Sequence, residues 1–525
     1  MGSRTKTFFS GVFFVMFVFI CIQFYKKDQT LNTRKNREQS DIQLGLDKYC
    51  LNTIKSVAHK DNEGNFVIPE KSVLSDLPLN ILDCLYHRYT TSLQAYCSRQ
   101  DKHGTCLSGW NVCVDVCYKP TNETVIRVLS GRVPYSDKVI QSVANAYHNR
   151  VFNYAPKAFG EGIKTEFIRA SNQLQHQMYT FTDDIHQSEV TNDVLIIDVG
   201  DLTKQTIDFI LENGFLKYFK QISFRTQYAD STKSRIDYVS ALYHLKQLYA
   251  NGFRIYWYEM EWDCLLKGSI YRTSCVTINW IHKNCENKAL SNNHPHLTIP
   301  DEAALSRFNA DQETLYFYKY LTSIQTHCKE IVRLGGIIDG GWEVCNDAKY
   351  RPHQSCLVYS FGINWDFKFD DAIAEAYGCE VHSFDPSMKK EDFQHSSKVS
   401  FHNIGLLNEN VHDVKTGWKL STLKGIRDNL GHLYRKINII KIDIEKSEWK
   451  AIPEMIQSGA LRDVLQLYIE FHSEGAKHPL HHLRILRLLY DEGFRIFWYH
   501  RNPNCCSNDK LHEYSLCNEV YFIRE

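Results

Sequence analysis

The sequence has no excess of charge of either sign. Lysine plus arginine and aspartate plus glutamate both total 61, so the formal net charge is zero. Nothing in the bulk composition directs the chain toward nucleic acid or acidic lipid, and we expect no nucleic-acid partner. At 525 residues the chain has room for two or three domains, each able to bury its own core.

The sequence also lacks the cysteine spacing of a structural zinc site. There is no CxxC pair, and the CxxxC of Cys113 and Cys117 has no matching second pair. Of the 17 cysteines, Cys21 lies in an apolar run, which leaves 16 spread over the rest of the chain. This use of cysteine predicts disulfides and an oxidising compartment, and the sequon at Asn122 is compatible with a glycoprotein.

An almost unbroken apolar run occupies Phe8 to Tyr25, with basic residues on both sides. It is about long enough for a transmembrane helix. Because it ends on bulky side chains and offers no small-x-small cleavage site, we expect an uncleaved signal-anchor rather than a cleaved signal peptide. The expected layout is a cytosolic tail (1–7), a transmembrane anchor (8–25) and a stem (26–83), followed by domains on the lumenal or extracellular side.

The rest of the chain contains an internal duplication. GFRIYWY at Gly252–Tyr258 recurs as GFRIFWY at Gly493–Tyr499, and GWNVC at Gly109–Cys113 matches GWEVC at Gly341–Cys345. Matches this far apart indicate two whole domains rather than short solenoid repeats. We therefore predict tandem units at 84–285 and 313–525, joined by a linker at 286–312.

Apolar runs alternate with amphipathic segments in the second unit, which predicts an α/β domain with a mainly parallel sheet. The end of the unit differs, because Phe494–Tyr499 and Glu519–Ile523 read as two strands with no helix between them. Two strands joined in this way should run antiparallel.

The turn after the strand that begins at Cys356 holds a single glycine, Gly362, in FGINWD. Dinucleotide-binding loops use three glycines, so NAD and FAD are unfavourable cofactors. Asp385 ends the next strand, where a carboxylate can accept both ribose hydroxyls of a bound nucleoside. Together these features suggest S-adenosylmethionine.

The second unit resembles the FkbM-like methyltransferases. The stretches that carry the resemblance are GGWEVCND (340–347), CLVYSFGINWDFKFDDA (356–372), GCEVHSFDPSM (378–388), IIKIDIEKSEWKAI (439–452) and QLYIEFH (466–472). The resemblance implies a class I methyltransferase fold, Rossmann-like with a seven-stranded sheet, in each of the two units. It also implies a cofactor site built from Phe361, Gly362, Asn364, Asp385 and Asp443. The sequence departs from the family where Lys446 follows Glu445, because the family often has glycine there.

Two pairs of polar residues mark the chemistry. Asp443 and Glu445 share one face at the end of a strand, as do Glu470 and His472 on the next strand. The acids could bind the amino-acid part of the cofactor, bind a metal or deprotonate an acceptor, or one of them could cap the helix that starts near Ser447. We assign all four residues to catalysis, with a carboxylate or His472 as base, and predict no metal ion.

The first unit keeps the apolar framework but not the polar site. Asp198 is retained in the place of Asp443, but Ala155 stands in the place of Asp385 and Gly200 in the place of Glu445. Arg225 and Gln227 stand in the places of Glu470 and His472. We interpret this unit as a degenerate methyltransferase fold that serves as a scaffold, an acceptor platform or packing support. By the repeat, Cys264 should pair with Cys275 and Cys505 with Cys517.

The predicted function is a membrane-anchored, S-adenosylmethionine-dependent methyltransferase of the secretory pathway or cell surface, with an unknown acceptor. A Golgi-type glycosyltransferase is an alternative, because Asp443-Ile444-Glu445 resembles a metal-binding acid pair for a sugar nucleotide. A non-catalytic binding protein is the third possibility. Retention of Gly362, Asp385 and the two acids counts against it.

Overall fold

The computed structural model describes most of the chain after residue 58. The described residues are 50, 57, 59–104, 109–121, 125–130, 142–147, 150–154, 181–185, 192–199, 203–226, 234–261, 273, 275–285, 296–337, 339–353, 355–473, 478–506 and 515–525. The expected anchor at 8–25 lies outside them, as do Asn122, Ala155, Gly200 and Cys264. Within these ranges, no helix has the length and apolar character needed to cross a bilayer.

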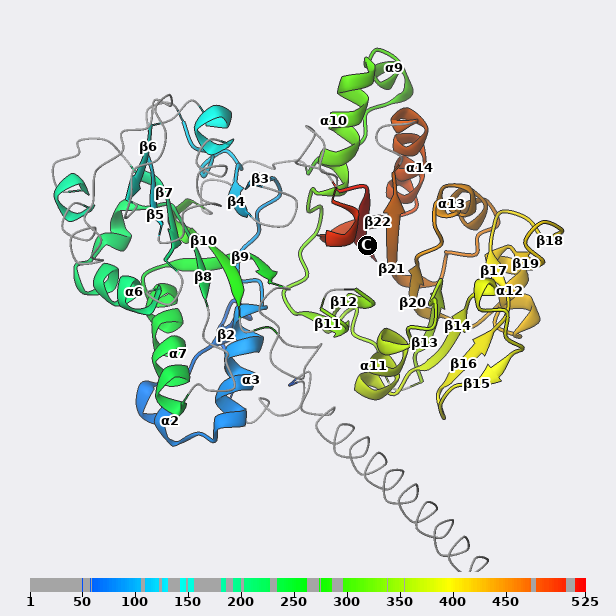
Figure 1. Ribbon diagram of the computed structural model, residues 1–525, viewed down its shortest axis with the longest axis horizontal. Coiled ribbons are helices and arrows are strands. Elements are labelled where there is room, and N and C mark those ends of the chain that lie inside the picture. The colour runs from blue at the N-terminus through cyan, green and yellow to red at the C-terminus, as the bar shows by residue number, and fades with distance from the viewer. Residues whose placement is uncertain are drawn as a thin grey trace, which may run out of the picture.

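The C-terminal half (residues 296–525) is built on one mixed sheet (Figure 1). Strands β16, β14, β13, β20 and β21 run parallel, and β23 runs antiparallel to both β21 and β22. In spatial order the strands are β15 (Phe393–Gln394), β16 (Val399–His402), β14 (Glu380–Phe384), β13 (Leu357–Phe361), β20 (Ile437–Ile442), β21 (Val464–His472), β23 (Cys517–Arg524) and β22 (Phe494–Arg501).

The predicted mainly parallel sheet with a final antiparallel pair is confirmed, but the sheet has eight strands instead of seven. The extra strand is β15, a two-residue segment that pairs only with β16. Without it the strands follow the chain order 3-2-1-4-5-7-6, which is a Rossmann-like arrangement. The order reverses between β13 and β20, where open α/β sheets form a crevice outside the carboxyl ends of the strands.

Helices flank this sheet because their apolar residues recur at helical spacing. In α13, for example, Trp449, Ile452 and Met455 are buried. Helix α14 packs against α10 and α13, and α11 packs against the hairpin of β11 and β12. The bounds are α9 (Glu302–Leu305), α10 (Ala310–Leu321), β11 (Ile331–Gly335), β12 (Gly341–Cys345), α11 (Lys368–Tyr377), α12 (Leu423–Asn429), α13 (Glu448–Gln457) and α14 (Pro479–Asp491).

A small second sheet lies on the β14 and β16 side of the main sheet (Figure 1). It contains β17 (Gly405–Leu406), β19 (Trp418–Ser421) and β18 (Val411–Asp413), in that spatial order. Strand β19 contacts the 3-10 turn that follows β14. No strands were predicted from the sequence at residues 405–421.

The N-terminal half (residues 59–285) contains a six-stranded sheet among its described residues. The sheet order is β6 (Arg150–Tyr154), β5 (Val125–Ser130), β7 (Asn192–Asp198), β8 (Gln221–Thr226), β10 (Val276–His282) and β9 (Phe253–Met260). The remaining elements are β1 (His59–Lys60), β2 (Phe66–Val67), α2 (Lys71–Asp76), α3 (Leu79–Thr90), β3 (Gln100–Gly104), β4 (Gly109–Cys113), α6 (Thr203–Glu212) and α7 (Arg235–Ala250). In chain order the strands read 2-1-3-4-6-5, which is the order of the C-terminal sheet with its third strand, β16, left out among the described residues.

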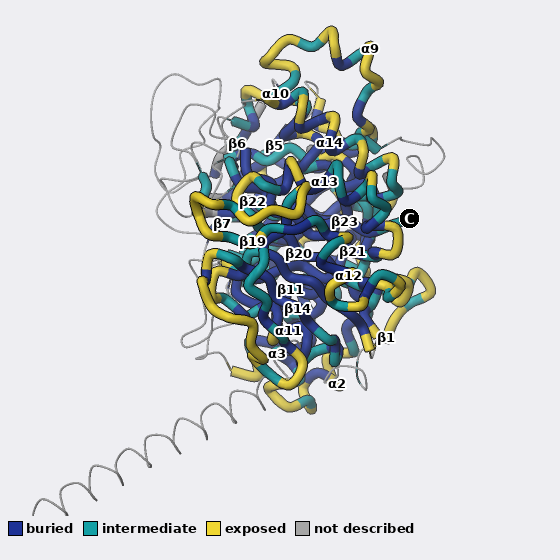
Figure 2. The backbone as a smooth tube through the Cα atoms, turned by 90° about the vertical axis from the view of Figure 1, so that its right-hand side faces the viewer, coloured by how far each residue is buried: buried dark blue, intermediate teal, exposed yellow. Residues whose placement is uncertain are grey.

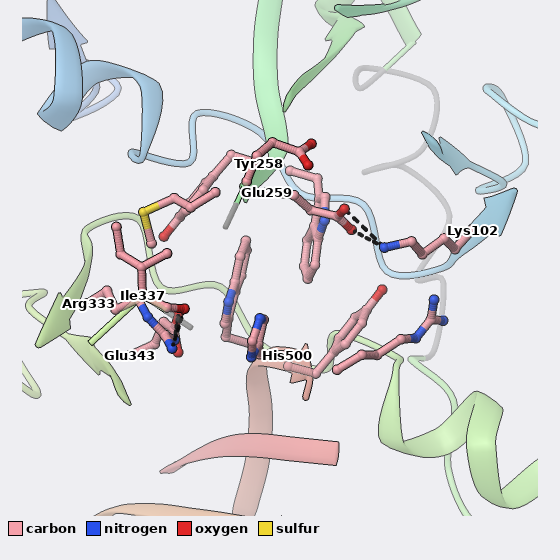
Figure 3. Close-up of a pocket in the computed structure, with 13 residues that line it drawn as sticks. Lys102, Tyr258, Glu259, Arg333, Ile337, Glu343 and His500 are labelled. Atoms are coloured by element: carbon pink, nitrogen blue, oxygen red, sulfur yellow. Dashed lines mark hydrogen bonds and ion pairs between the residues drawn. The ribbon is translucent and has the colours of Figure 1, made fainter. Parts of the chain in front are cut away.

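The two halves meet through their edge strands β9 and β22, which carry the repeated GFRI motifs (Figure 3). Trp257 stacks on Trp498 with ring centroids 3.8 Å apart, and both residues are buried. Next to this stack lies a small cavity of about 70 Å³, lined from both halves and containing the ion pairs Lys102–Glu259 and Arg333–Glu343. The duplicated segments therefore form part of the contact between the halves, which also includes the ion pair Arg88–Glu330 and the hydrogen bond from the Tyr96 hydroxyl to the carbonyl of Ile324.

The cores of both halves lie along the central strands, which are buried from end to end (Figure 2). Disulfides close several loops around these cores, and they join Cys50–Cys84, Cys97–Cys113, Cys328–Cys345, Cys356–Cys379 and Cys505–Cys517. The predicted Cys505–Cys517 pair is confirmed. The predicted partner of Cys275, Cys264, lies outside the described residues.

Candidate active site

A cavity of about 690 Å³ opens at the carboxyl ends of β13, β14, β20 and β21. This is the crevice expected at the reversal of strand order. All the predicted site residues line it, and they are Phe361, Gly362, Asn364, Asp385, Asp443, Glu445, Glu470 and His472. Their convergence follows from the fold, since each stands at or just beyond the end of a strand and parallel strands end at one edge of the sheet.

Gly362 is required by the backbone of a neighbouring strand. Its φ is +73°, in the left-handed region, and a Cβ there would lie 1.6 Å from the carbonyl oxygen of Asp443. The glycine thus lets the turn after β13 pack against the end of β20. This differs from a dinucleotide-binding loop, where glycine lets the backbone approach a pyrophosphate.

Asp385 is buried, and its carboxylate organises the turn around it. One oxygen, Oδ2, accepts a hydrogen bond of 2.8 Å from the backbone N–H of Asn364. The other, Oδ1, accepts from the backbone N–H and the hydroxyl of Ser387, at 2.8 and 2.6 Å. A carboxylate offers about four acceptor positions, so about one is left for a ligand in the cavity. That leaves room for one ribose hydroxyl, not the two we expected from the sequence.

An apolar wall stands beside Asp385, where a flat heterocyclic ring could pack. It is contributed by Phe384, Pro386 and the small sheet of β17–β19, from which Leu406 and Leu420 line the cavity. Phe384 is itself fixed by stacking on Phe361, with ring centroids 4.5 Å apart. This wall could not be predicted from the sequence, because strands of two to four residues have no detectable periodicity.

At the other end of the cavity, acidic side chains surround a histidine. His472 Nε2 lies 3.8 Å from Asp443 Oδ1 and 3.7 Å from Glu445 Oε2. Glu470 lies two residues before His472 on β21 and is buried. Its Oε1 accepts a 3.0 Å hydrogen bond from the side-chain amide of Asn502. The four residues assigned to catalysis therefore form one cluster.

Burial and mutual repulsion change the protonation of this cluster. The pKa of Glu470 rises to about 9 because the side chain is buried and lies close to Asp443 and Glu519. Burial also raises the pKa of Asp443. For His472 burial acts in the opposite direction, but the hydrogen bond to Glu448 and the surrounding carboxylates outweigh it and raise the pKa to about 9. Because all three pKa values are raised, each of these groups holds its proton more tightly than usual, and the cluster favours positive charge.

Two further residues of the site were not predicted from the sequence. Glu448, at the start of α13, is fully buried, and its Oε1 accepts from both the backbone N–H of His472 (2.9 Å) and the ring Nδ1 (3.2 Å). Lys441 donates to the carbonyls of Phe361 (3.0 Å) and Gly362 (2.7 Å), and so holds the turn after β13. The signal was available in part, since both residues lie within the KIDIEKSE stretch.

The corresponding position of the N-terminal half has different chemistry. Where the C-terminal half has Glu470 and Asn502, it has Arg225 and Glu261, whose charged atoms are 3.9 Å apart. In the place of Glu470, one of the acids of the cluster, the N-terminal half therefore has a cation. Of the other substitutions that we identified in the sequence, those at Ala155, Gly200 and Gln227 lie outside the described residues.

Comparison with known proteins relates the C-terminal half to methyltransferases. Residues 279–517 match a family model described as a methyltransferase domain, so the C-terminal half carries a methyltransferase domain. Probable methyltransferase-like protein 24 of Homo sapiens is 28% identical over 176 residues, which cover 31% of this chain and 48% of that protein. Its Rattus norvegicus counterpart is 28% identical over 191 residues, covering 34% and 52%. The chain thus spans about half the length of these curated relatives.

Similar solved structures include the Methanococcus jannaschii fibrillarin pre-rRNA processing protein, with a TM-score of 0.21 at 13% identity over 31% of this chain and 67% of that one. Another is Haemonchus contortus phosphoethanolamine N-methyltransferase 2 in complex with S-adenosyl-L-methionine, with a TM-score of 0.21 at 11% identity over 77% and 95%. These scores are too low to support an argument. The family match confirms the resemblance of the C-terminal half to methyltransferases, and it supports S-adenosylmethionine as cofactor. It starts at residue 279 and does not test the tandem copy.

Proposed function

We propose that the C-terminal half transfers a methyl group from S-adenosylmethionine to a nucleophile held in the 690 Å³ cavity. The observation that carries the proposal is the layout of this cavity, with a buried carboxylate and an apolar wall at one end and an acid–histidine cluster at the other. An adenosine fits the first end, and an acceptor nucleophile fits the second.

The cofactor end fits the residues that are present. Asp385 would accept one ribose hydroxyl, and the adenine would pack against Phe384 and Leu406. The turn of Phe361, Gly362 and Asn364 stands between these groups and Asp443, and Lys441 and Asp385 hold its backbone. When bound, S-adenosylmethionine supplies an electrophilic methyl group on a sulfonium.

The protein contributes mainly by orientation. Holding an acceptor in line with a reactive methyl group replaces a bimolecular encounter by a positioned one. Asp443, Glu445, Glu470 and His472 face the acceptor end and balance the charge that changes there when the nucleophile loses its proton. Glu448 keeps the His472 ring in one orientation.

For the N-terminal half we propose a methyltransferase-like fold that no longer binds the cofactor. The shared strand order supports this proposal, as does the Arg225–Glu261 ion pair, which puts a cation in the place of Glu470. Its role is to bind the exposed edge of the C-terminal sheet, where β22 meets β9.

We further propose that residues 8–25 anchor the chain in a membrane of the secretory pathway or cell surface, with both halves on the oxidising side. The five disulfides among the described residues support this topology. S-adenosylmethionine is made in the cytosol, so a lumenal enzyme needs it transported. Protease protection of an epitope at Glu525 in intact microsomes tests the topology, and ready digestion would reverse the orientation.

Calorimetry on the whole chain tests the function. We expect saturable binding of S-adenosylmethionine, and no binding of a UDP-sugar in the presence of Mn²⁺. Binding of the sugar nucleotide alone would overturn the proposal and favour the glycosyltransferase alternative.

A further inference from the structure

We propose that Asp443, Glu445 and His472 form a binding site for a divalent metal ion, with Mn²⁺ as the ion that their donor atoms suit. This replaces the expectation from sequence that no metal is bound. The site lies at the acceptor end of the cavity. The choice of acceptor below rests on the proposed methyltransferase function, whereas the metal site itself does not.

The spacing of the three donor atoms fits an ion between them. All lie within 4.8 Å of one another, and His472 Nε2 is 3.8 Å from Asp443 Oδ1 and 3.7 Å from Glu445 Oε2. These separations are too long for hydrogen bonds. Two ligands about 2.1 Å from one ion lie roughly 3.0 Å apart at the octahedral angles that Mn²⁺ prefers and roughly 3.4–3.6 Å apart at tetrahedral or trigonal angles. Small side-chain movements would therefore complete the coordination.

The surroundings of His472 suit a metal ligand. Its side chain is only 10% exposed, and among the described residues Nε2 takes part in no hydrogen bond. The other ring nitrogen, Nδ1, lies 3.2 Å from the carboxylate of Glu448, whose side chain is fully buried. Nδ1 therefore donates its proton to Glu448, and Nε2 faces Asp443 and Glu445, where a metal ion would take the place of an Nε2 proton. A carboxylate behind a histidine is the usual support of a metal ligand.

Lys441 places a positive charge beside Asp443 but leaves the proposed metal site open. Lys441 Nζ lies 3.7 Å from Oδ2 of Asp443, which is the carboxylate oxygen turned away from His472. Its ammonium is also bound to the carbonyls of Phe361 and Gly362. Lys441 thus fixes the carboxylate so that Oδ1 faces the imidazole.

The donor set indicates which ion and which acceptor fit. Two carboxylate oxygens and one imidazole nitrogen suit Mn²⁺ or Zn²⁺ better than Mg²⁺, which prefers oxygen alone. The Glu445 side chain is 85% exposed, so the ion would keep open positions toward the cavity. An acceptor with two neighbouring oxygens, such as vicinal hydroxyls or a hydroxyl beside a carboxylate, could fill them. The ion would lower the pKa of a bound hydroxyl.

Electron paramagnetic resonance of Mn²⁺ added to the whole chain, without S-adenosylmethionine, tests the site. We expect one bound ion per chain in the wild type and at least tenfold weaker binding in Glu445→Gln. His472→Gln should weaken binding further. Glu409→Gln removes the same charge from an exposed position that does not line the cavity, and should change nothing.

Because the Glu445 side chain is exposed, its variant should fold normally, and circular dichroism checks this for both site variants. Absence of Mn²⁺ binding in the wild type, or equal binding in Glu445→Gln, would overturn the metal site. If S-adenosylmethionine binds in calorimetry and Mn²⁺ does not, the metal inference alone is wrong. If Mn²⁺ binds at these residues and S-adenosylmethionine does not, the metal inference stands and the proposed function fails.

Discussion

Asp385 shows how one carboxylate can serve both the fold and a ligand. Its three accepted hydrogen bonds tie the turn after β13 to the turn after β14, because Asn364 belongs to the first and Ser387 to the second. The position was predictable, since an acid that ends the strand after a glycine turn faces the crevice. How many acceptor positions remain for a ribose could be known only from the folded geometry.

Asp385→Ala should lower the affinity for S-adenosylmethionine by one to three orders of magnitude. The change removes the one charge-assisted hydrogen bond to the ribose, worth roughly 1.5–3 kcal/mol at about 1.4 kcal/mol per tenfold, and the loss grows because the turn at Asn364 is no longer held. Calorimetry on the whole chain measures this. Ser387→Ala is the control, because it removes one hydroxyl and keeps the carboxylate. Unchanged affinity in Asp385→Ala would place the cofactor elsewhere.

Gly362→Ala should destabilise the protein by about 3 kcal/mol or more, because the new Cβ would overlap the carbonyl of Asp443 as well as strain the backbone. Gly417 has nearly the same φ, +75°, but nothing lies within 4 Å of a Cβ built there. Gly417→Ala should therefore cost only the strain, about 1–2 kcal/mol. Thermal unfolding compares the stability of the two variants. Equal losses of stability would show that the structure relaxes to accommodate the new Cβ at Gly362.

At the scale of elements, the strands of the C-terminal half could be read from the sequence, since β14, β20, β21 and β22 are short apolar runs between amphipathic segments. The acidic residues of the site could be predicted together with these strands, because their position at the strand ends follows from the same pattern. Glu448 was missed since it stands in the first turn of α13 and meets His472 only through tertiary packing. The wall of β17–β19 was missed because its strands are too short to show a pattern.

The Cys505–Cys517 disulfide joins the end of β22 to the start of β23 at the wall of the cavity. Cys517 is also the strand partner of His472. The double variant Cys505→Ser, Cys517→Ser should therefore lose about 2–4 kcal/mol of stability and also bind S-adenosylmethionine and Mn²⁺ more weakly. Unfolding midpoints and the two binding assays measure these effects.

Removal of Cys356–Cys379 provides the matched control. This disulfide joins the starts of β13 and β14, at the opposite end of the strands from the cavity. It should cost comparable stability and leave both affinities unchanged. Equal loss of binding in the two double variants would mean that the effect comes from general destabilisation.

At the scale of the whole molecule, the halves are related by an approximate two-fold arrangement. Trp257 and Trp498 occupy the same place in the two GFRI motifs, and they stack on each other. Tyr96 and His327, each one residue before the first cysteine of its half's matching disulfide, also face each other, with ring centroids 6.1 Å apart. Equivalent residues that meet each other are the mark of an isologous interface. The duplication was visible in the sequence, but the pairing of its copies was not.

His327 makes this interface sensitive to acid. Burial, and then the charge of Lys329, lower the pKa of His327 to about 4, below the usual value near 6.5. Its Nε2 is buried and has no hydrogen-bond partner among the described residues. Because the folded state binds the proton less well than the unfolded state, the full contribution to stability is present above pH 6.5. It is lost progressively as the pH falls from 6.5 to 4.

We therefore expect His327→Phe to lose less stability than the wild type on acidification across this range. The difference should reach about 1–2 kcal/mol by pH 5, at about 1.4 kcal/mol per pH unit. Phenylalanine cannot be protonated, and an aromatic ring already fills the equivalent place at Tyr96. Thermal unfolding at pH 7.5 and pH 5 measures the effect in both proteins. His59→Phe is the control, because His59 is exposed and should leave the pH dependence unchanged. If His327→Phe and the wild type lose the same stability between the two pH values, protonation of His327 does not weaken the contact between the halves.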